Sequence, residues 1–441
     1  MEETPQTYSP TAKSTATLQR DPVKTVILAS MIGTAIEFFD FYAYGTAAAT
    51  YFPNVFFPSV TPTIAMILSL LTFGVAFIAR PLGSLLFGHF GDKLGRKRAL
   101  VVSLLLMGVS TVLIGVLPGY KTLGITAILL LCLARFIQGI GLGGEWSGAV
   151  LVATENAPKG KRALYGAFPE LGAPIGFLLS NGLFFILESM LTPAQMASFG
   201  WRVPFLASAV LVIVGLWVRR KMQETPLFQL AQQKNTVEKA PLVEVFRKSW
   251  RQVLQGTLTM GVSYTFFFLL STWSLSYATT ALGFNNKEWL LLLMAAIVVF
   301  AAMILYSSIL ADKVGRKKVL ITGTILIIVF AFIFPFFFQG QHNLFGSLFF
   351  LFIGFLTMGV IYGPIGALLP ELFPTSTRYS GAGIAYNMSA IVGAAFAPTI
   401  ASFLVDKWGI HAVGIYLAIM STVSLIALLT TKETKSIDYT K

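Results

Sequence analysis

The sequence is poor in charged residues. Only 12% of its 441 residues are Asp, Glu, Lys or Arg, whereas 55% are hydrophobic. A soluble domain usually carries about 25% charged residues, so this chain cannot present a charged surface to water on all sides. Apolar stretches of about 20 or more residues recur along it, which is the length that an α-helix needs to cross a bilayer. The composition therefore excludes an ordinary soluble protein and predicts a polytopic membrane protein.

The sequence also has few residues that build catalytic or metal sites. Cys132 is the only cysteine, so no internal disulfide can form, and a small apolar filler is its expected role. The three histidines are scattered, and no HExxH motif, GxSxG motif or cysteine cluster occurs. We therefore expect no metal site and no enzyme activity. A channel is disfavoured because no filter-like loop is present, while a sensor of the same architecture remains an alternative.

The apolar stretches favour helices over strands. They are continuously apolar, whereas the strands of a membrane barrel alternate between apolar and polar residues. Because backbone groups in lipid must bond within their own segment, a bundle of helices remains. We predict about twelve spans by this length criterion, and their expected starts lie near residues 25, 63, 99, 123, 163, 202, 252, 289, 319, 343, 379 and 409.

Two loop motifs occur twice, half the chain apart. GHFGDKLGRKRAL at 88–100 returns as SILADKVGRKKVL at 308–320, and the ExxPxxxR pattern of 155–162 returns at 371–378. An even number of spans separates the copies, so both copies of each loop face the same side, as in parallel transporter repeats that rock around a site between them. The expected domains are a tail 1–22, a six-helix bundle 23–218, a linker 219–251, a second bundle 252–431 and a tail 432–441.

The net charge of +13 reflects topology. Of the 32 Lys and Arg residues, 26 lie on the side that shares the amino terminus, and the opposite loops hold four. This asymmetry is the positive-inside pattern, which predicts that both termini are cytoplasmic. It also makes nucleic acid an unexpected partner. Residues 1–22 lack the apolar core of a cleavable signal.

The motifs resemble a known transporter family. The GxxxDKxGRK loop is similar to the signature loop of the major facilitator superfamily. Together with IEFFDFYAYG at 36–45 and ARFIQGIGLGGEWSGA at 134–149, the stretch 80–100 resembles the metabolite:proton symporter family of that superfamily. Members of that family carry shikimate, 2-oxoglutarate, citrate, proline or betaine. One departure is Ser308, which replaces the first glycine of the second loop copy.

The resemblance implies a gate of charged residues on the cytoplasmic side. Ion pairs at the membrane edge can break and re-form at modest cost when water enters. The alternative is that the basic residues only set the topology, which leaves the matched acids unexplained. The implied gate residues are Asp92, Arg96, Glu155, Arg162, Asp312, Arg316, Glu371 and Arg378.

Ionisable residues inside spans are functional candidates, because charge within a bilayer is costly. In the first half these are Glu37, Asp40, Arg80, Arg135, Glu145 and Glu170, whereas the corresponding stretches of the second half are neutral. Glu37 and Asp40 are three residues apart, which places both carboxylates on one face of their helix. Arg135, Gln138 and Glu145 form a polar stripe by the same spacing rule. Both faces are expected to line the central cavity.

The deep carboxylates outnumber the deep cations. Three acids, Glu37, Asp40 and Glu145, face only Arg80 and Arg135, and a desolvated acid without a fixed partner can bind and release a proton. These acids are therefore the candidates for proton coupling, with Asp40 or Glu37 preferred. The alternative is that they pair with the arginines only to hold helices together.

A substrate carboxylate would match the planar fork of Arg135 best, with Arg80 second. Gln138 and the second-half residues Tyr264, Tyr362 and Asn387 are candidates for neutral contacts, although aromatic residues in spans often serve packing.

The expected function is proton-coupled symport of a small organic acid or zwitterion across the inner membrane, driven by the proton gradient without a cofactor. A proton-coupled export antiporter is the alternative, since Gly172, Pro174 and Gly176 partly resemble an antiporter motif.

Overall fold

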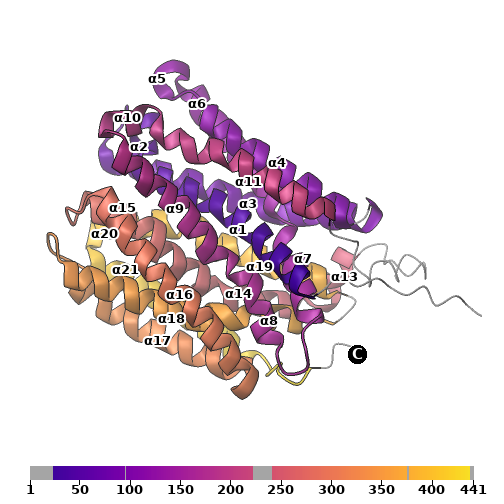
Figure 1. Ribbon diagram of the computed structural model, residues 1–441. Helices are drawn as coiled ribbons and strands as arrows, with labels where there is room; N and C mark the ends of the chain where they lie inside the picture. Colours follow the sequence, from indigo (N-terminus) through magenta and orange to yellow (C-terminus); the bar gives the residue numbers. More distant parts are fainter. Residues whose placement is uncertain (1–22, 95, 222–240, 375–376, 438–441) are drawn as a thin grey trace, which may run out of the picture.

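A computed structural model describes residues 23–94, 96–221, 241–374 and 377–437 of the chain. These residues form helices joined by short loops, and no strand occurs among them. Figure 1 shows two bundles: the indigo and magenta helices of the first half lie above the orange and yellow helices of the second. The predicted tail 1–22, residues 222–240 of the linker and residues 438–441 lie outside the described residues.

The first bundle comprises six spans, several of which are made of two helical segments. Short helices at its loops are α2 (Phe52–Phe56), α5 (Tyr120–Leu123) and α10 (Pro193–Ser198). The spanning elements are α1 (Val23–Thr50), α3 (Pro62–Leu94), α4 (Arg96–Val116), α6 with α7 (Ile125–Leu142 and Glu145–Glu155), α8 with α9 (Arg162–Glu170 and Gly172–Met190), and η1 with α11 (Gly200–Arg202 and Val203–Lys221).

The second bundle follows a short linker helix, α13 (Pro241–Lys248). Two of its spans contain a π-helical turn, η2 or η3. Its spanning elements are α14, η2 and α15 (Trp250–Phe268, Leu269–Trp273 and Ser274–Thr280), α16 (Asn286–Val314), α17 (Arg316–Phe337), α18 (Leu344–Glu371), α19, η3 and α20 (Arg378–Ala390, Ile391–Ala395 and Ala397–Trp408), and α21 (Ile410–Thr430).

The span count agrees with the expectation from sequence. Among the described residues, ten helical segments are long and apolar enough to cross a membrane, and α4 adds the shorter apolar stretch Val101–Val116. The 28-residue α1 completes the twelve spans. Each observed span begins within one helical turn of its predicted start. The all-α fold of two six-helix bundles is therefore confirmed.

Glycines let the fourth span lie directly on α3. A Cβ atom added at Gly139 would lie 2.1 Å from the Ala76 carbonyl oxygen, and one at Gly143 would lie 2.3 Å from the carbonyl oxygen of Arg80. Only a residue without a side chain fits such spacing, so these glycines allow close helix packing. At Gly143 and Gly144 the span also breaks, because α6 ends at Leu142 and α7 begins at Glu145.

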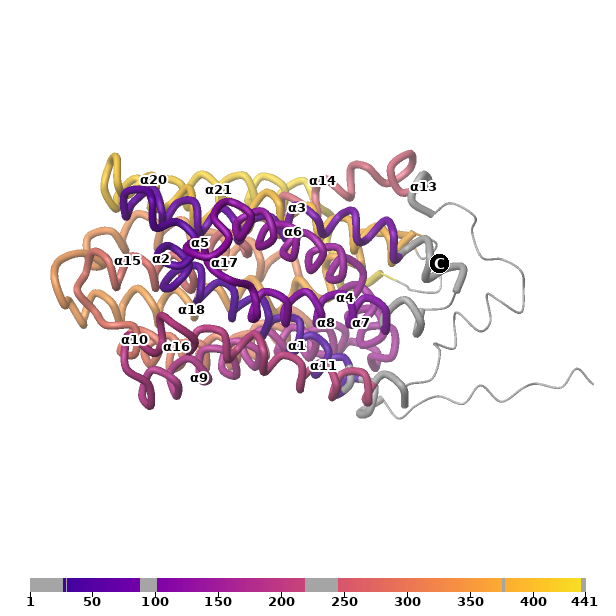
Figure 2. Tube along the Cα trace, turned by 90° about the horizontal axis from the view of Figure 1, so that it is seen from above, coloured from indigo at the N-terminus to yellow at the C-terminus, as the bar shows by residue number. Residues whose placement is uncertain are grey.

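The two bundles meet along a seam. On one side α8 and α9 pack on α16 and α18, and on the other α3 packs on α19, η3 and α20. We call the end at which α3 joins α4 and α16 joins α17 the motif end, since the repeated loops lie there. Figure 2 shows the long helices running between this end and the opposite end.

The seam is open only partway. A cavity of about 1140 Å³ at the opposite end is lined by both halves, with Asn54 and Thr63 on one side and Trp273, Tyr277 and Asp406 on the other. Deeper in the seam, aromatic rings from both halves fill the space, such as Tyr42 against Phe267 at 5.5 Å between ring centroids.

Candidate functional site

A buried ion pair lies at the seam. Arg80 of α3 donates a hydrogen bond to Glu37 of α1, and each side chain is 1% exposed. The guanidinium lies over the ring of Phe41 at 5.0 Å and over the ring of Tyr386 at 5.3 Å. Tyr386 belongs to α19, so the second half covers the pair. Arg80 thus faces the second half directly.

A second polar cluster lies inside the first bundle. Thr111 of α4 donates a 2.7 Å hydrogen bond to Asp40 Oδ2, and Gln138 donates one of 2.8 Å to Thr111. Arg135 donates to Gln138 and to the Phe73 carbonyl oxygen, and its guanidinium lies 3.8 Å from the ring centre of Tyr44. The cluster therefore connects α1, α4 and α6 within one half.

The sequence predicted that Glu37 and Asp40 share one helix face and that Arg135, Gln138 and Glu145 form one stripe, and the structure differs on both points. Glu37 and Asp40 lie about 60° apart around α1 at the helical spacing, so their side chains reach different neighbours, α3 and α4. Arg135 and Gln138 point into the first bundle, and the aromatic ring of Phe73 separates them from Phe268 of the second half. The break before α7 also ends the polar stripe that sequence spacing assigned to Arg135, Gln138 and Glu145. Glu145 is buried at the start of α7.

A fourth buried acid of the first half, Glu170, was predicted as an interior charge but was assigned no role in the site. It is the last residue of α8 and is fully buried. Trp146 of α7 donates a 3.0 Å hydrogen bond to Glu170 Oε1. The Trp146 ring stacks on Tyr386, with centroids 3.9 Å apart and planes 4° apart. The sequence placed Glu170 near the start of its span, and its largely apolar flanks were the signal for burial.

The predicted second-half residues lie along the same seam. Tyr264 of α14 lies 5.4 Å from Tyr386 between ring centroids, and Tyr362 of α18 is buried and faces Glu170. Asn387 of α19 donates a 2.8 Å hydrogen bond to the Gly143 carbonyl oxygen, across the seam. These side chains form a neutral wall opposite the charged first half.

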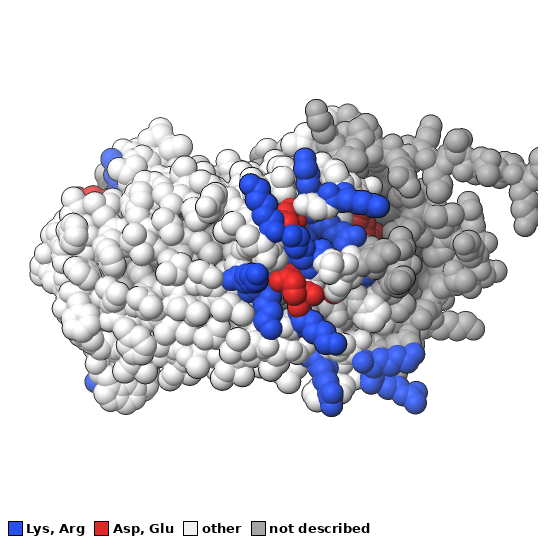
Figure 3. Space-filling model, turned by 90° about the horizontal axis from the view of Figure 1, so that it is seen from below, with Lys and Arg blue, Asp and Glu red and all other residues white. Residues whose placement is uncertain are grey.

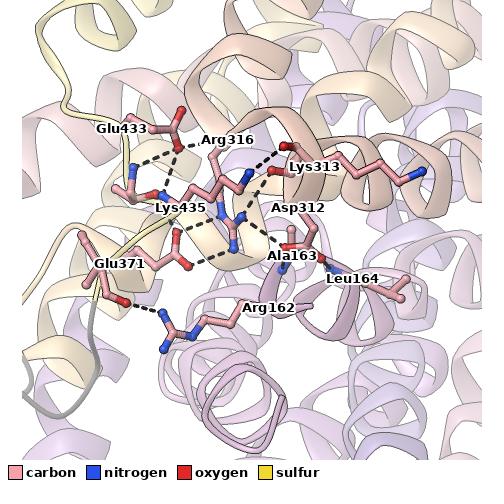
Figure 4. Close-up of polar contacts among 12 residues, drawn as sticks. Arg162, Ala163, Leu164, Asp312, Lys313, Arg316, Glu371, Glu433 and Lys435 are labelled. Atoms are coloured by element: carbon pink, nitrogen blue, oxygen red, sulfur yellow. Dashed lines mark hydrogen bonds and ion pairs between the residues drawn. The ribbon is translucent and has the colours of Figure 1, made fainter. Parts of the chain in front are cut away.

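At the motif end, charged residues of the second half contact the first half. Arg316 binds Glu371 through two hydrogen bonds of 3.2 Å and lies 3.1 Å from Asp312. The two Asp312 carboxylate oxygens accept hydrogen bonds of 3.0 Å from the backbone N–H groups of Ala163 and Leu164, in the first turn of α8 (Figure 4). This carboxylate therefore joins the two halves.

The segment after α21 packs on this network, although the sequence indicated a tail there. Glu433 accepts hydrogen bonds of 2.9 and 3.1 Å from the backbone N–H groups of Arg316 and Lys317, which caps α17. Thr434 donates a 2.6 Å hydrogen bond to Glu371. Arg162 of the first half donates to the Ile437 carbonyl oxygen (Figure 4). Up to residue 437 this segment is ordered against both halves.

The remaining predicted gate residues have varied settings. The side chains of Asp92 and Arg96 lie outside the described residues. Glu155 is exposed at the end of α7, and Arg378 is buried and donates a 3.4 Å hydrogen bond to the Phe373 carbonyl oxygen. Figure 3 shows Lys and Arg gathered around acidic side chains at the motif end, while the visible flank of the bundle is largely uncharged.

The two bundles meet over buried charge, are joined at one end and enclose a cavity at the other. This is the architecture of an alternating-access transporter. The sugar (and other) transporter family matches residues 25–441. The inner membrane metabolite transport protein YhjE of Escherichia coli (strain K12) is 52% identical over 415 residues, which cover 93% of this chain and 94% of that protein. The shikimate transporter of the same organism is 36% identical over 427 residues, covering 95% and 97% respectively.

Solved structures show the same fold. A crystal structure of a D-xylose-proton symporter superposes with a TM-score of 0.75 at 18% identity, covering 94% of this chain and 99% of the other. The chain belongs to the sugar (and other) transporter family and is a metabolite transporter of the major facilitator superfamily. The predicted superfamily is thereby confirmed, and the function is transport rather than enzyme catalysis.

Proposed function

We propose that this protein is a proton-coupled symporter that takes up a small organic acid or zwitterion across a bacterial inner membrane. The observation that carries the proposal is the charge inside the first bundle: Asp40 and the Glu37–Arg80 pair are fully buried next to a seam that is open at one end. The names of the relatives support the location and the substrate class, since they include an inner membrane metabolite transport protein and a shikimate transporter.

Asp40 is the proposed proton carrier. Its Oδ2 atom accepts from Thr111, whereas Oδ1 has no hydrogen-bond partner in the described part of the chain. Arg135 interacts with it electrostatically. Protonation of Asp40 would weaken this attraction, so loading a proton changes the forces between α1 and α6. Glu37 and Glu145 remain the other candidates for proton coupling.

Arg80 is the proposed contact for a substrate carboxylate. It faces the second half, whereas Arg135, the first choice from sequence, lies behind an aromatic layer. We then assign Arg135 and Gln138 a positioning role for Asp40. Tyr264, Tyr362 and Asn387 are the proposed neutral contacts from the second half. A guanidinium already paired with Glu37 can exchange that partner for a substrate carboxylate of the same geometry.

The motif end is the proposed cytoplasmic side, with both termini in the cytoplasm. The concentration of Lys and Arg there supports this orientation through the positive-inside rule. The closed contacts of Asp312, Arg316 and Glu371 are then a cytoplasmic gate. Asp92, Arg96, Glu155, Arg162 and Arg378 are the further proposed members of this gate.

Uptake into vesicles tests the proposal. The protein is reconstituted, an inward proton gradient is imposed, and a panel of carboxylates and betaines is screened for accumulation. We expect Asp40→Asn to abolish uphill accumulation while retaining exchange of substrate across the membrane, because exchange needs no net proton movement. Glu288→Gln is the matched control, since this exposed capping residue of α16 lies far along the chain from the site. Wild-type accumulation by the Asp40→Asn variant would refute the carrier role.

The same experiment separates symport from export by antiport, since an antiporter expels substrate against the proton gradient. The glycines that suggested an antiporter have a packing role here. A Cβ atom at Gly172 would lie 2.0 Å from Thr34 Oγ1, and one at Gly176 would lie 2.6 Å from the Ala35 carbonyl oxygen. Both glycines bring α9 against α1 within the first bundle, which favours neither direction of transport.

A further inference from the structure

Glu170 occupies a place in the seam that the proposed transport cycle has not used. Its Oε1 atom accepts from Trp146, and its Oε2 atom has no hydrogen-bond partner in the described part of the chain. The backbone of the second half closes directly over it: a Cβ atom added at Gly366 of α18 would lie 3.3 Å from Glu170 Oε1. The same hypothetical atom would lie 2.6 Å from the Gly166 carbonyl oxygen, so α8 and α18 touch here.

Among the described residues, no cation is paired with Glu170. The titratable groups that face it are Glu37 and Tyr42 of α1, Tyr264 of α14, Tyr362 of α18 and Tyr386 of α19. Arg80 of α3 pairs with Glu37 instead. From α16, the nearest charged contact with α8 is Asp312, which accepts from the first turn of α8 and pairs with Arg316.

A carboxylate without a cation is unfavourable in such a dry site, because the cost of removing charge from water is not offset by an ion pair. Such a group takes up either a proton or a cationic ligand. The close approach of Trp146 and of the backbone at Gly366 leaves little room beside the carboxylate, which favours the proton, the smaller of the two. A proton satisfies the charge and gives Oε2 a hydrogen to donate.

The position of Glu170 decides which solvent supplies that proton. It ends α8, whose first turn is held by Asp312 at the motif end. Separation of α8 from α18 at that end would wet the carboxyl, whereas opening of the opposite end leaves the contact between Gly166 and Gly366 in place. Water at the motif end is therefore the exchanging solvent.

We propose that Glu170 is a proton-binding site that holds the motif end closed when occupied. A proton from water at the motif end bonds to Oε2 as α8 and α18 close, and it returns to the same water when they part. This proton makes no net crossing, so it is distinct from the one carried by Asp40. The inference rests on the alternating-access part of the proposed function and needs neither symport nor a particular substrate.

The sign of the pH dependence follows from this binding. The closed motif end binds one more proton at Glu170 than the open one, so acid favours closure and rising pH favours opening. For a single proton, the ratio of closed to open molecules changes by up to about tenfold per pH unit. The transporter would then be held closed on the motif side when that compartment is acidic.

Distance measurements between spin labels test the site without any substrate. Labels are placed on cysteines at Lys159 and Lys318, two exposed positions on different halves at the motif end, in a Cys132→Ala background. Distances are recorded in vesicles from pH 5 to pH 9. We expect a short distance at low pH that gives way to a longer one as pH rises. In Glu170→Gln, which keeps an acceptor for Trp146 but cannot ionise, the short distance should persist at every pH.

Two further variants sharpen the result. Glu170→Asp keeps an ionisable group and should keep the pH dependence, and Glu288→Gln, the exposed matched control, should behave as the wild type. The proposal is overturned if Glu170→Gln opens with pH as the wild type does, or if the wild type shows no pH dependence. Closure that follows added Na⁺ at high pH, rather than acid, would overturn it in favour of a cation site. None of these outcomes depends on whether the uptake experiment succeeds.

Discussion

The two halves share their loops but differ in their interiors. In the first half Glu37, Asp40, Arg80, Arg135 and Glu170 are all buried within spans. In the described part of the second half, the buried charges gather instead at the motif end, as Arg316, Glu371 and Arg378. The interior of that half presents mostly aromatic rings and small polar groups to the seam. The repeated loops are thus common to both halves, whereas the charges buried deep within spans belong to the first half.

This division has a physical benefit for a rocking transporter. Charges buried in a membrane protein must stay compensated as it moves. The Glu37–Arg80 pair and the Asp40–Arg135 cluster each lie within one bundle, so rotation of the bundles does not break them. Contacts that would break on such a rotation include those between a charge and backbone N–H groups, as at Asp312, and those between neutral groups, as at Asn387.

Removing the central cation should have the largest effect. Arg80→Gln takes away the guanidinium that faces Glu37, and breaking a buried ion pair by removing one partner costs about 3–5 kcal/mol. We expect a marked fall in thermal unfolding temperature in detergent, and the double variant Glu37→Gln/Arg80→Gln should recover most of it. Tyr386→Phe, which alters the second-half residue whose ring covers Arg80, should change stability far less. Equal falls in unfolding temperature for Arg80→Gln and Tyr386→Phe would contradict the asymmetry between the halves.

Substitution of Asp312, a proposed gate residue, tests whether the two loop copies have the same role. Asp312→Asn keeps one acceptor but loses the charge that binds the Ala163 and Leu164 N–H groups, and hydrogen bonds to charged groups contribute about 1.5–3 kcal/mol. The spin-label distance at the motif end should shift toward the open state. Asp92→Asn, at the matching position of the first loop copy, should shift it by a similar amount. A change in only one of the two variants would show that the copies have diverged in function.

The loop glycine of the second copy should have a smaller effect. Gly315 has φ +108°, and a Cβ atom there would lie 2.4 Å from Glu433 Oε2. Gly315→Ala should destabilise the protein by about 1–3 kcal/mol from backbone strain alone, and more from the contact. Gly340→Ala is the matched control, because Gly340 also has a positive φ, of +87°, but has open space around its Cβ position. Thermal unfolding of the two variants separates strain from contact with the segment after α21.

The smallest expected effect concerns one neutral contact across the seam. Tyr379 donates a 2.9 Å hydrogen bond to the Gly144 carbonyl oxygen of the other half. Tyr379→Phe should weaken closure of the seam by about 0.5–1.5 kcal/mol, read as a modest rise in the open fraction in the spin-label measurement. Tyr306→Phe, at a side chain 60% exposed on the outer surface, is the control. A larger effect than that of Asp312→Asn would reverse the proposed importance of charge at the gate.

Prediction from sequence succeeded where a local pattern carries the information. Helix starts follow from apolar length and from the charged loops, so they were predicted closely along the whole chain. The internal repeat showed in the same way, and buried Glu37, Asp40, Arg80 and Arg135 were predicted as interior charges. Glu170 was predicted as an interior charge but was assigned no role, because its surroundings depend on α18, which lies far away in sequence. The packing of residues 431–437 was missed for the same reason, since Glu433 lies next to α17 only in the folded chain.

The sequence by itself determined that this is a membrane transporter of two related halves with its interior charges in the first half. Hydrophobic length, loop charge and repeated motifs are local properties of the sequence, so they can be recognised without knowledge of the fold. Tertiary structure alone decided the partners of those charges: Arg80 faces the second half while Arg135 supports Asp40 from within the first. The physical reason is that residues on adjacent turns of one helix diverge by tens of degrees, and the neighbouring helices that they meet decide whether a charge lies in the seam or behind it.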